Sequence, residues 1–153
     1  MNSIKTFLLD DHRHCDDVFA DVEKAVALPD WGRAASAFAS LNSAMEQHFM
    51  AEETILFPAF EAKTGMSRGP TEVMRVEHVQ MRALLAAAGQ SLRDKDAEDY
   101  AGNTETLLIM MQQHNMKEEH VLYPMCDDHL ADQSDTLLHS MGQTLSQAVG
   151  YRA

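Results

Sequence analysis

The chain has 153 residues, with 24 acidic and 12 basic side chains and a formal charge of −12 at pH 7. This length predicts a single domain with a real hydrophobic core, and the acidic balance without a basic patch argues against nucleic acid or an anionic membrane as a partner. No apolar run approaches the roughly 20 residues that span a bilayer and no signal peptide is evident, so we expect a cytoplasmic protein.

The first two predicted helices cover residues 4–28 and about 31–60. In the first, apolar positions step alternately by four and three residues, the pattern of a helix facing a core: Leu8, His12, Cys15, Phe19, Val22 and Val26. A Pro-Asp-Trp-Gly turn ends it, with Asp30 as the expected N-cap of the next helix. Pro58 should kink or end that second helix. Its stripe is Leu41, Met45, His48, Glu52, Ile55 and Ala59.

The third and fourth predicted helices follow a loop at residues 64–70 and cover about 71–92 and 97–124. The third carries Met74, His78, Met81, Leu85, Ala88 and Leu92. The fourth carries Leu107, Met111, His114, Glu118, Val121 and Met125. A last amphipathic helix at 135–149 has no counterpart and is expected on the outside of the others. Its apolar positions are Leu137, Leu138, Met141, Leu145 and Val149.

The chain contains an internal repeat. HFMAEETILFPAF begins at His48 and HNMKEEHVLYPMC begins at His114. The two segments align without a gap at an offset of 66 residues (114 − 48). The same offset relates the stripes of the first and third helices. Two similar helix pairs, at about 4–62 and 70–128, predict an all-α, antiparallel up-down four-helix bundle with a pseudo-twofold repeat.

The stripes place six metal-binding side chains at core positions. In each repeated segment a His and a Glu four residues apart share one helix face. A lone core His is usually satisfied by a hydrogen bond, but an unsatisfied buried polar group costs several kcal/mol, and four His in register with two Glu favour a shared metal site. The six are His12, His48, Glu52, His78, His114 and Glu118.

The number and type of these ligands indicate which metal they bind. Two ions would each take two His, with the two Glu as bridges, and a bridging oxide or hydroxide would leave each ion five-coordinate with an open position. Structural zinc prefers four ligands, and magnesium and calcium prefer oxygen. Mixed imidazole and carboxylate ligands suit two iron ions, with manganese as the alternative. The open position favours chemistry with O2, peroxide or NO over hydrolysis.

The motifs also carry a resemblance. DH at 11–12, HFMAEE at 48–53, EH at 77–78 and HNMKEE at 114–119, with the LFP and LYP that follow, resemble the hemerythrin-like, HHE cation-binding family over nearly all of residues 4–126. The resemblance implies one domain, a four-helix bundle around a non-haem di-iron centre. By matching position, the terminal ligands would be His12, His48, His78 and His114, and the bridges Glu52 and Glu118.

Two departures separate this chain from oxygen-carrying hemerythrins. Those proteins have a fifth His where this chain has Arg82, and an Asp where it has Glu119, so Glu118 is the better bridge. The four-His, two-Glu pattern is more similar to the di-iron domain of bacterial iron–sulfur-centre repair proteins, which carry an additional N-terminal cysteine-bearing domain that we do not expect here.

Three functional hypotheses follow. The first is a redox-active di-iron protein, typical of stress responses, that binds, senses or reduces O2, peroxide or NO; whether it turns over as a peroxidase-like or NO/O2-reducing enzyme stays open. The second is an iron donor that hands iron to an acceptor protein for the repair of iron–sulfur clusters. The third is a binding module whose bundle changes shape with iron or redox state and acts on a redox partner.

Other side chains near the motifs receive simpler interpretations. Cys15 is a small buried hydrophobe or, alternatively, a redox partner or weak ligand of one iron. Cys126 is expected to be incidental, and Phe57 and Tyr123 to pack at the end of the bundle rather than to act as radical or gating residues. Methionines are expected to form an apolar wall around an oxygen site: Met45, Met74, Met81 and Met111.

The remaining polar groups near the motifs are assigned to the edge of the core or to the surface. Four acidic side chains adjoin the ligands and should lie at the boundary of the core or in an outer layer around them: Asp11, Glu53, Glu77 and Glu119. Four histidines lie off the repeated stripes and are expected at the surface: His14, His120, His129 and His139.

Overall fold

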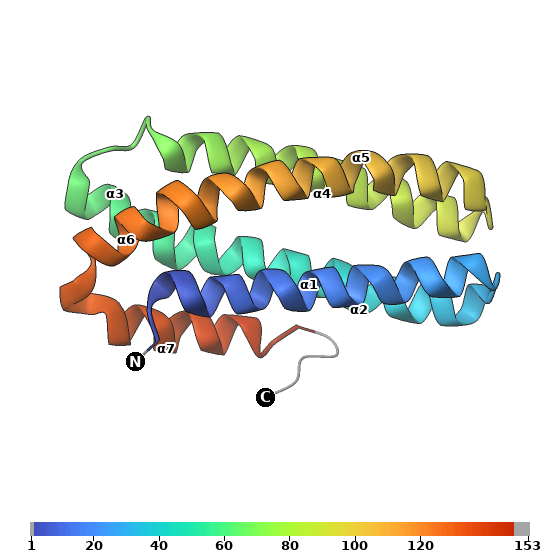
Figure 1. Ribbon diagram of the computed structural model, residues 1–153, viewed down its shortest axis with the longest axis horizontal. Helices are drawn as coiled ribbons and strands as arrows, with labels where there is room; N and C mark the ends of the chain where they lie inside the picture. The colour runs from blue at the N-terminus through green and yellow to red at the C-terminus, as the bar shows by residue number, and fades with distance from the viewer. Residues whose placement is uncertain (1, 149–153) are drawn as a thin grey trace.

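Four long antiparallel helical rods make up the protein, which was analysed as a computed structural model that describes residues 2–148. The rods run up, down, up and down (Figure 1), and the described residues contain no strand. This confirms the predicted fold class. The α-helices are α1 (Ile4–Ala27), α2 (Trp31–Ala51), α3 (Phe57–Thr64), α4 (Pro70–Arg93), α5 (Ala97–Lys117), α6 (Tyr123–His129) and α7 (Ser134–Leu145).

The repeat is visible in the bounds of the elements. A π-helical segment, η1 (Glu52–Leu56), joins α2 to α3, and a second one, η2 (Glu118–Leu122), joins α5 to α6; the short η3 (Ala131–Gln133) precedes α7. Helices α4 and α5 and segment η2 begin and end at the offset of the sequence repeat from α1, α2 and η1. The bundle is therefore two copies of one helix pair, packed α1 on α2 and α4 on α5.

Matching caps start the second and fourth rods. Asp30 caps α2 by accepting from the backbone N–H of Arg33 at 3.1 Å, and Asp96 caps α5 in the same way through Asp99 at 3.0 Å. Each cap satisfies an N–H that the first helical turn leaves without an intrahelical partner. The carboxylate of Asp127 on α6 accepts from the first backbone N–H groups of α1 at 2.8 and 3.2 Å, which ties the end of the second half to the start of the first.

The π-helical segments correct the predicted ends of the second and fourth rods. Pro58 does not end the helical rod. It lies in the first turn of α3, where a missing backbone N–H costs no helical hydrogen bond. The extra residue in each π turn also changes which side chains face inward. Leu122 and Tyr123 are buried, while Val121, predicted on the stripe, is 53% exposed; likewise Leu56 is buried in place of Ile55.

The hydrophobic core divides into two clusters along the bundle, and the buried His and Glu side chains lie between them. One cluster lies toward the α1–α2 and α4–α5 turns and includes Phe19, Leu41 and Leu107. The other includes Leu8 and Leu122 and is completed by α7. Polar groups buried between two apolar clusters need partners within the protein, because leaving them without partners costs free energy.

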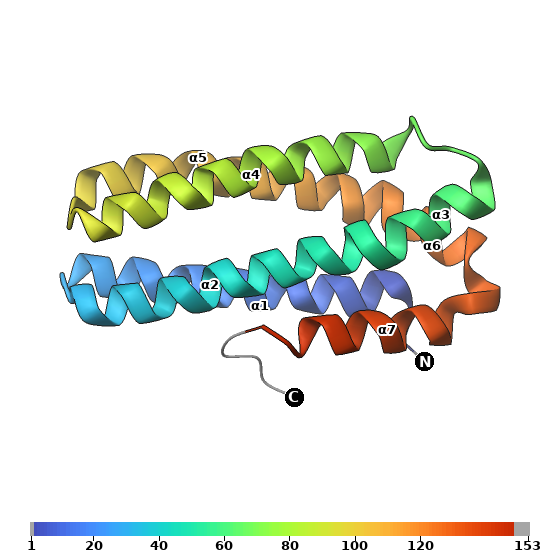
Figure 2. The same cartoon turned by 180° about the vertical axis from the view of Figure 1, so that it is seen from behind.

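Helix α7 packs on the outer side of the bundle, as predicted. It lies against α2, η1 and α1 (Figures 1 and 2) and buries Leu137, Met141 and Leu145. Its predicted last apolar position, Val149, lies outside the described residues. In the part of the chain that the structure describes, none of the helices combines the length and the apolar character needed to cross a membrane.

Candidate metal centre

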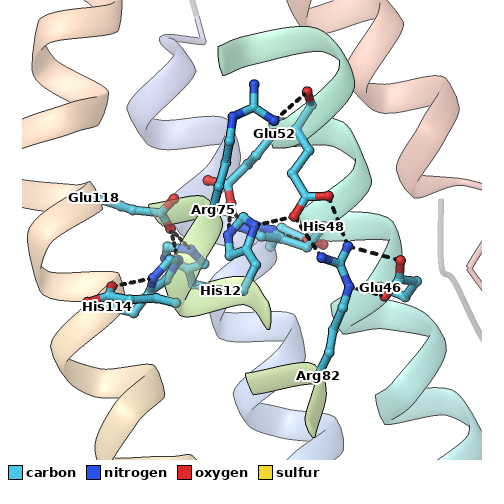
Figure 3. A network of polar contacts seen from close by, with 12 residues as sticks. His12, Glu46, His48, Glu52, Arg75, Arg82, His114 and Glu118 are labelled. Carbon is cyan, nitrogen blue, oxygen red and sulfur yellow. Dashed lines mark hydrogen bonds and ion pairs between the residues drawn. The ribbon is translucent and has the colours of Figure 1, made fainter. Parts of the chain in front are cut away.

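The six side chains singled out in the sequence converge in the middle of the bundle, and all are buried. They come from all four rods: His12 from α1, His48 from α2, Glu52 from η1, His78 from α4, His114 from α5 and Glu118 from η2. Oε1 of Glu118 lies 3.2 Å from Nε2 of His12 and 3.2 Å from Nε2 of His114. Glu118 therefore joins a histidine one turn back on its own rod to a histidine on α1 (Figure 3).

Glu52 makes the matching connection on the other side. Its Oε1 atom lies 3.1 Å from Nε2 of His78 and 3.6 Å from Nε2 of His48. Each carboxylate thus lies between one histidine of each repeat half, the position that a bridging ligand of two ions requires. The sequence could predict this layer because both Glu and His recur on one helix face in both halves.

Each of the four histidines is held from the outside by a carboxylate. In every case Nδ1 lies within hydrogen-bond distance of the acid, which fixes the ring with Nε2 directed inward. The predicted outer positions of these acids are confirmed. The pairs are His12 with Glu119 at 2.7 Å, His48 with Asp11 at 2.7 Å, His78 with Glu53 at 2.6 Å and His114 with Glu77 at 2.9 Å.

Arg82 and Lys117 hold two of the four outer carboxylates. Arg82 donates from Nη1 to Oε2 of Glu53 at 2.8 Å and from Nε to Oε2 of Glu46 at 2.9 Å, and Figure 3 shows it between its acidic partners. Lys117 donates to Glu77. Because Arg82 is committed to this ion-pair network, it orients Glu53 and thereby His78, and it does not point into the centre.

We expect Glu53→Gln to weaken metal binding by about 10- to 100-fold, the usual cost of losing a carboxylate behind a ligating histidine. The side chain would keep its size but lose the charge that holds Nδ1–H of His78. Glu46→Gln is the matched control, because Glu46 shares Arg82 but contacts none of the six inner residues. Competition with a chromophoric chelator measures both variants, and equal affinities would show that Glu53 has no such role.

The structure corrects the interpretation of Tyr123. It was predicted to pack at the end of the bundle, yet its hydroxyl donates to Oε2 of Glu52 at 2.6 Å and lies 2.9 Å from Oε1 of Glu118. On a regular α-helix a residue five positions after Glu118 would lie about 140° away from it. The π turn of η2 brings the two onto one face. Its counterpart Phe57 was also predicted at the end of the bundle, but it too lies beside the centre, stacked on His78 and under the guanidinium of Arg75.

A small cavity of about 20 Å³ adjoins the histidines on the side away from Tyr123. Rings of His12, His48 and His114 line it together with Cys15 and the apolar side chains Met45, Phe49, Met81 and Met111. Three of the four methionines that were expected to form an apolar wall line this cavity, whereas Met74 lies in the other core cluster. The space holds about one water-sized molecule.

The donor atoms fall into two overlapping groups in which all atoms lie within 4.8 Å of one another. One group contains four residues and the other three, and Glu118 belongs to both: Glu52, His78, His114 and Glu118, and His12, His48 and Glu118. Among the described residues, four inward-facing atoms of this layer are buried without a hydrogen bond: Oε1 of Glu52, Oε2 of Glu118, and Nε2 of His78 and His114. Lone pairs left unsatisfied in this way fit metal ions.

Without an ion, the buried carboxylates raise the pKa values of His12, His48 and His114. Burial by itself would lower the pKa of His114, but the negative charges of Glu118 and Glu52 and the hydrogen bond with Glu77 raise it to about 9. The pKa of His48 is raised well above its ordinary value, against the effect of burial, chiefly by the charge of Glu52. Burial would raise the pKa of Glu52, yet the charge of His48 and hydrogen bonds hold it well below its usual range. Protons thus occupy the places that cations would take.

The combination of two histidine pairs, two shared glutamates and an internal repeat agrees with a family comparison. The sequence model of the hemerythrin HHE cation binding domain matches residues 3–126. The chain belongs to this family. Comparison with curated proteins and with solved structures found no match.

Within this hemerythrin domain, the remaining predictions have mixed outcomes. Cys126, expected to be incidental, is fully buried in the second hydrophobic cluster. Three of the off-stripe histidines are exposed as predicted, and His14 is half-buried. The sequence interpretation missed the contact of Tyr123 with the centre; the signal that could have identified it is a Tyr in one copy of the repeat where the other has Phe.

Proposed function

We propose that the protein is a non-haem di-iron hemerythrin that binds and reacts with O2, peroxide or NO. The observation that carries this proposal is the pair of overlapping donor groups sharing Glu118, directly beside a cavity of about 20 Å³. His12, His48, His78 and His114 would be terminal ligands, and Glu52 and Glu118 would bridge. Bound iron would supply redox equivalents and open coordination positions, with manganese as the alternative metal.

The chain's own residues would prepare this centre in three ways. The four outer carboxylates hold the imidazoles in the tautomer that presents Nε2 to the ions. The two core clusters exclude water from the layer between them. The cavity wall formed by Cys15, Met45, Met81 and Met111 is apolar. Apart from the histidine rings, the polar residue that lines the cavity is Asn115, so a charged molecule would find few polar partners there.

Donation of iron to damaged iron–sulfur clusters is the second candidate function, and the burial of the site disfavours it. All six inner side chains are buried, and each histidine is held from outside by a carboxylate. Release of iron to an acceptor protein would require these pairs to open. We therefore rank reaction with a small oxidant first.

The direct test is metal analysis of the purified protein followed by anaerobic reduction and exposure to O2, NO and peroxide in turn. Two iron ions per chain and a change in absorption with at least one reagent are the expected result. A protein that holds two irons and responds to none of the three would contradict the proposed reaction. A protein that takes up no iron would contradict the centre itself.

Cys15→Leu should block the cavity without removing a ligand. The larger side chain fills space next to His12 and His48, and this overpacking lowers the free energy of unfolding by about 1–3 kcal/mol. Because no ligand is removed, the iron content should stay at two per chain. The rate of the response to O2 or NO should fall at least tenfold.

Cys15→Ser is the control for thiol chemistry, because it nearly keeps the size. Burial raises the pKa of Cys15 well above its ordinary value, so the thiol is protonated and the serine variant should react with peroxide like the unaltered protein. A changed spectrum or rate in Cys15→Ser would instead make Cys15 a redox partner or weak ligand of the iron.

A further inference from the structure

An aromatic side chain breaks the internal symmetry of the centre. Position 57 is Phe, and position 123, its counterpart in the second copy of the repeat, is Tyr. Phe57 stacks on His78 with ring centroids 5.8 Å apart, whereas Tyr123 stacks on His12 at 5.6 Å. Both rings are fully buried. A hydroxyl group therefore enters only the half of the centre that contains His12.

This half is also the one with fewer donors. Its group has three members, His12, His48 and Glu118, against four in the other group. The hydroxyl oxygen of Tyr123 lies 3.2 Å from Nε2 of His12, 3.4 Å from Nε2 of His48 and 2.9 Å from Oε1 of Glu118. The oxygen is thus within 3.4 Å of a donor atom of every member of the smaller group, where a fourth donor to one ion belongs.

The surrounding charges distinguish the two halves in the same direction. Behind His78 and His114, the outer carboxylates are paired with Arg82 and Lys117. Behind His48 and His12, Asp11 and Glu119 form no ion pair with Lys or Arg among the described residues. An outer carboxylate makes its imidazole more basic. An outer carboxylate without a Lys or Arg partner keeps its full negative charge and favours a metal ion of higher charge. Ferric rather than ferrous iron is therefore favoured on the side that Tyr123 faces.

We propose that Tyr123 is a seventh protein ligand of the centre and binds, through its hydroxyl oxygen, the iron ion held by His12 and His48. This inference rests on the di-iron centre proposed above. As the iron–oxygen bond forms, the phenol O–H bond breaks and its proton leaves to solvent, so no electron is transferred in the step. Tyr123 then supplies a further protein donor to that ion, and the two ions are chemically distinct.

The test uses the full-length protein loaded with two equivalents of ferrous iron and oxidised in air. A phenolate bound to ferric iron produces a visible charge-transfer absorption, and excitation in that band enhances tyrosine ring vibrations in the Raman spectrum. We expect both in the unaltered protein. Tyr123→Phe, loaded to the same iron content, should lose both signals completely.

Tyr100→Phe is the matched control, since Tyr100 is also buried and its hydroxyl has no hydrogen-bond partner among the described residues, but it lies in the other core cluster. It should keep the full band. Two bound irons without enhanced tyrosine vibrations in the unaltered protein would overturn the ligand role of Tyr123, leave the di-iron centre intact and make the residue a hydrogen-bond donor to Glu52. Absence of bound iron would overturn both proposals.

Discussion

Glu118→Gln should leave the chain unable to hold two metal ions. Glu118 is the one residue common to both donor groups, and its Oε1 lies 3.2 Å from a nitrogen of His12 and of His114. The amide keeps the shape but removes the negative charge and one of the two anionic oxygens. We expect affinity for at least one ion to fall by more than the roughly 10- to 100-fold that loss of an outer carboxylate costs, and iron content to fall to one per chain or less.

Glu119→Gln is the matched comparison, because it alters the next residue along the same rod. Glu119 contacts Nδ1 of His12 from outside, so its amide should weaken binding by only about 10- to 100-fold and leave two irons at saturation. Metal content after desalting and circular dichroism of both variants provide the measurement. If Glu119→Gln loses more iron than Glu118→Gln at equal helix content, the assignment of Glu118 as the bridge is wrong.

The inner layer of the centre could be predicted from sequence because it repeats. A single core histidine has several satisfied alternatives, but His48 and Glu52 recur as His114 and Glu118 at one offset, on one helix face. Helical periodicity then places them in the core, and four rods leave only one interior in which they can meet. The observed bounds of the elements follow the same offset.

What escaped prediction depends on departures from regular helix geometry and on contacts between distant elements. Tyr123 faces the carboxylates only because η2 adds a residue to the turn. Regular α-helical spacing predicts instead that Val121 faces the core, whereas Val121 is exposed. The pairing of Asp11 with His48 joins residues 37 positions apart on different helices, a contact that no local pattern encodes. The cavity beside Cys15 is a gap left between side chains that come from different helices, and its presence depends on how these side chains pack.

The metal-free protein should lose stability as pH rises from about 6.5 to about 9. The pKa of His114 is raised from an ordinary 6.5 to about 9 in the folded chain, and the pKa values of His12 and His48 are raised as well. Between these limits the folded state holds protons that the unfolded state has released. A group with a raised pKa contributes its full stabilisation of the folded state below the unfolded pKa, here about pH 6.5. This stabilisation, on the order of 3 kcal/mol for His114, is lost as the pH rises through the folded pKa of about 9.

At acidic pH, the stability of the metal-free protein changes with pH in the opposite direction. The pKa of Glu52 is held well below the ordinary 4.5, so its contribution is present above about 4.5 and is lost as pH falls through the folded value. The metal-free protein should therefore be most stable between about pH 4.5 and 6.5, where His12, His48 and His114 are protonated and Glu52 is ionised.

Metal ions should reverse the alkaline slope, because they replace the protons on Nε2 of the histidines. The loaded protein then binds fewer protons than the unfolded chain near pH 6, so its stability rises through 6.5 and levels off at higher pH. Urea unfolding at pH 6.0, 7.5 and 9.0, with chelator and with ferrous iron under anaerobic conditions, measures both slopes. His139→Asn, an exposed histidine on α7, should alter neither slope. Parallel slopes with and without metal would mean that the protons and the ions do not compete for the same nitrogen atoms.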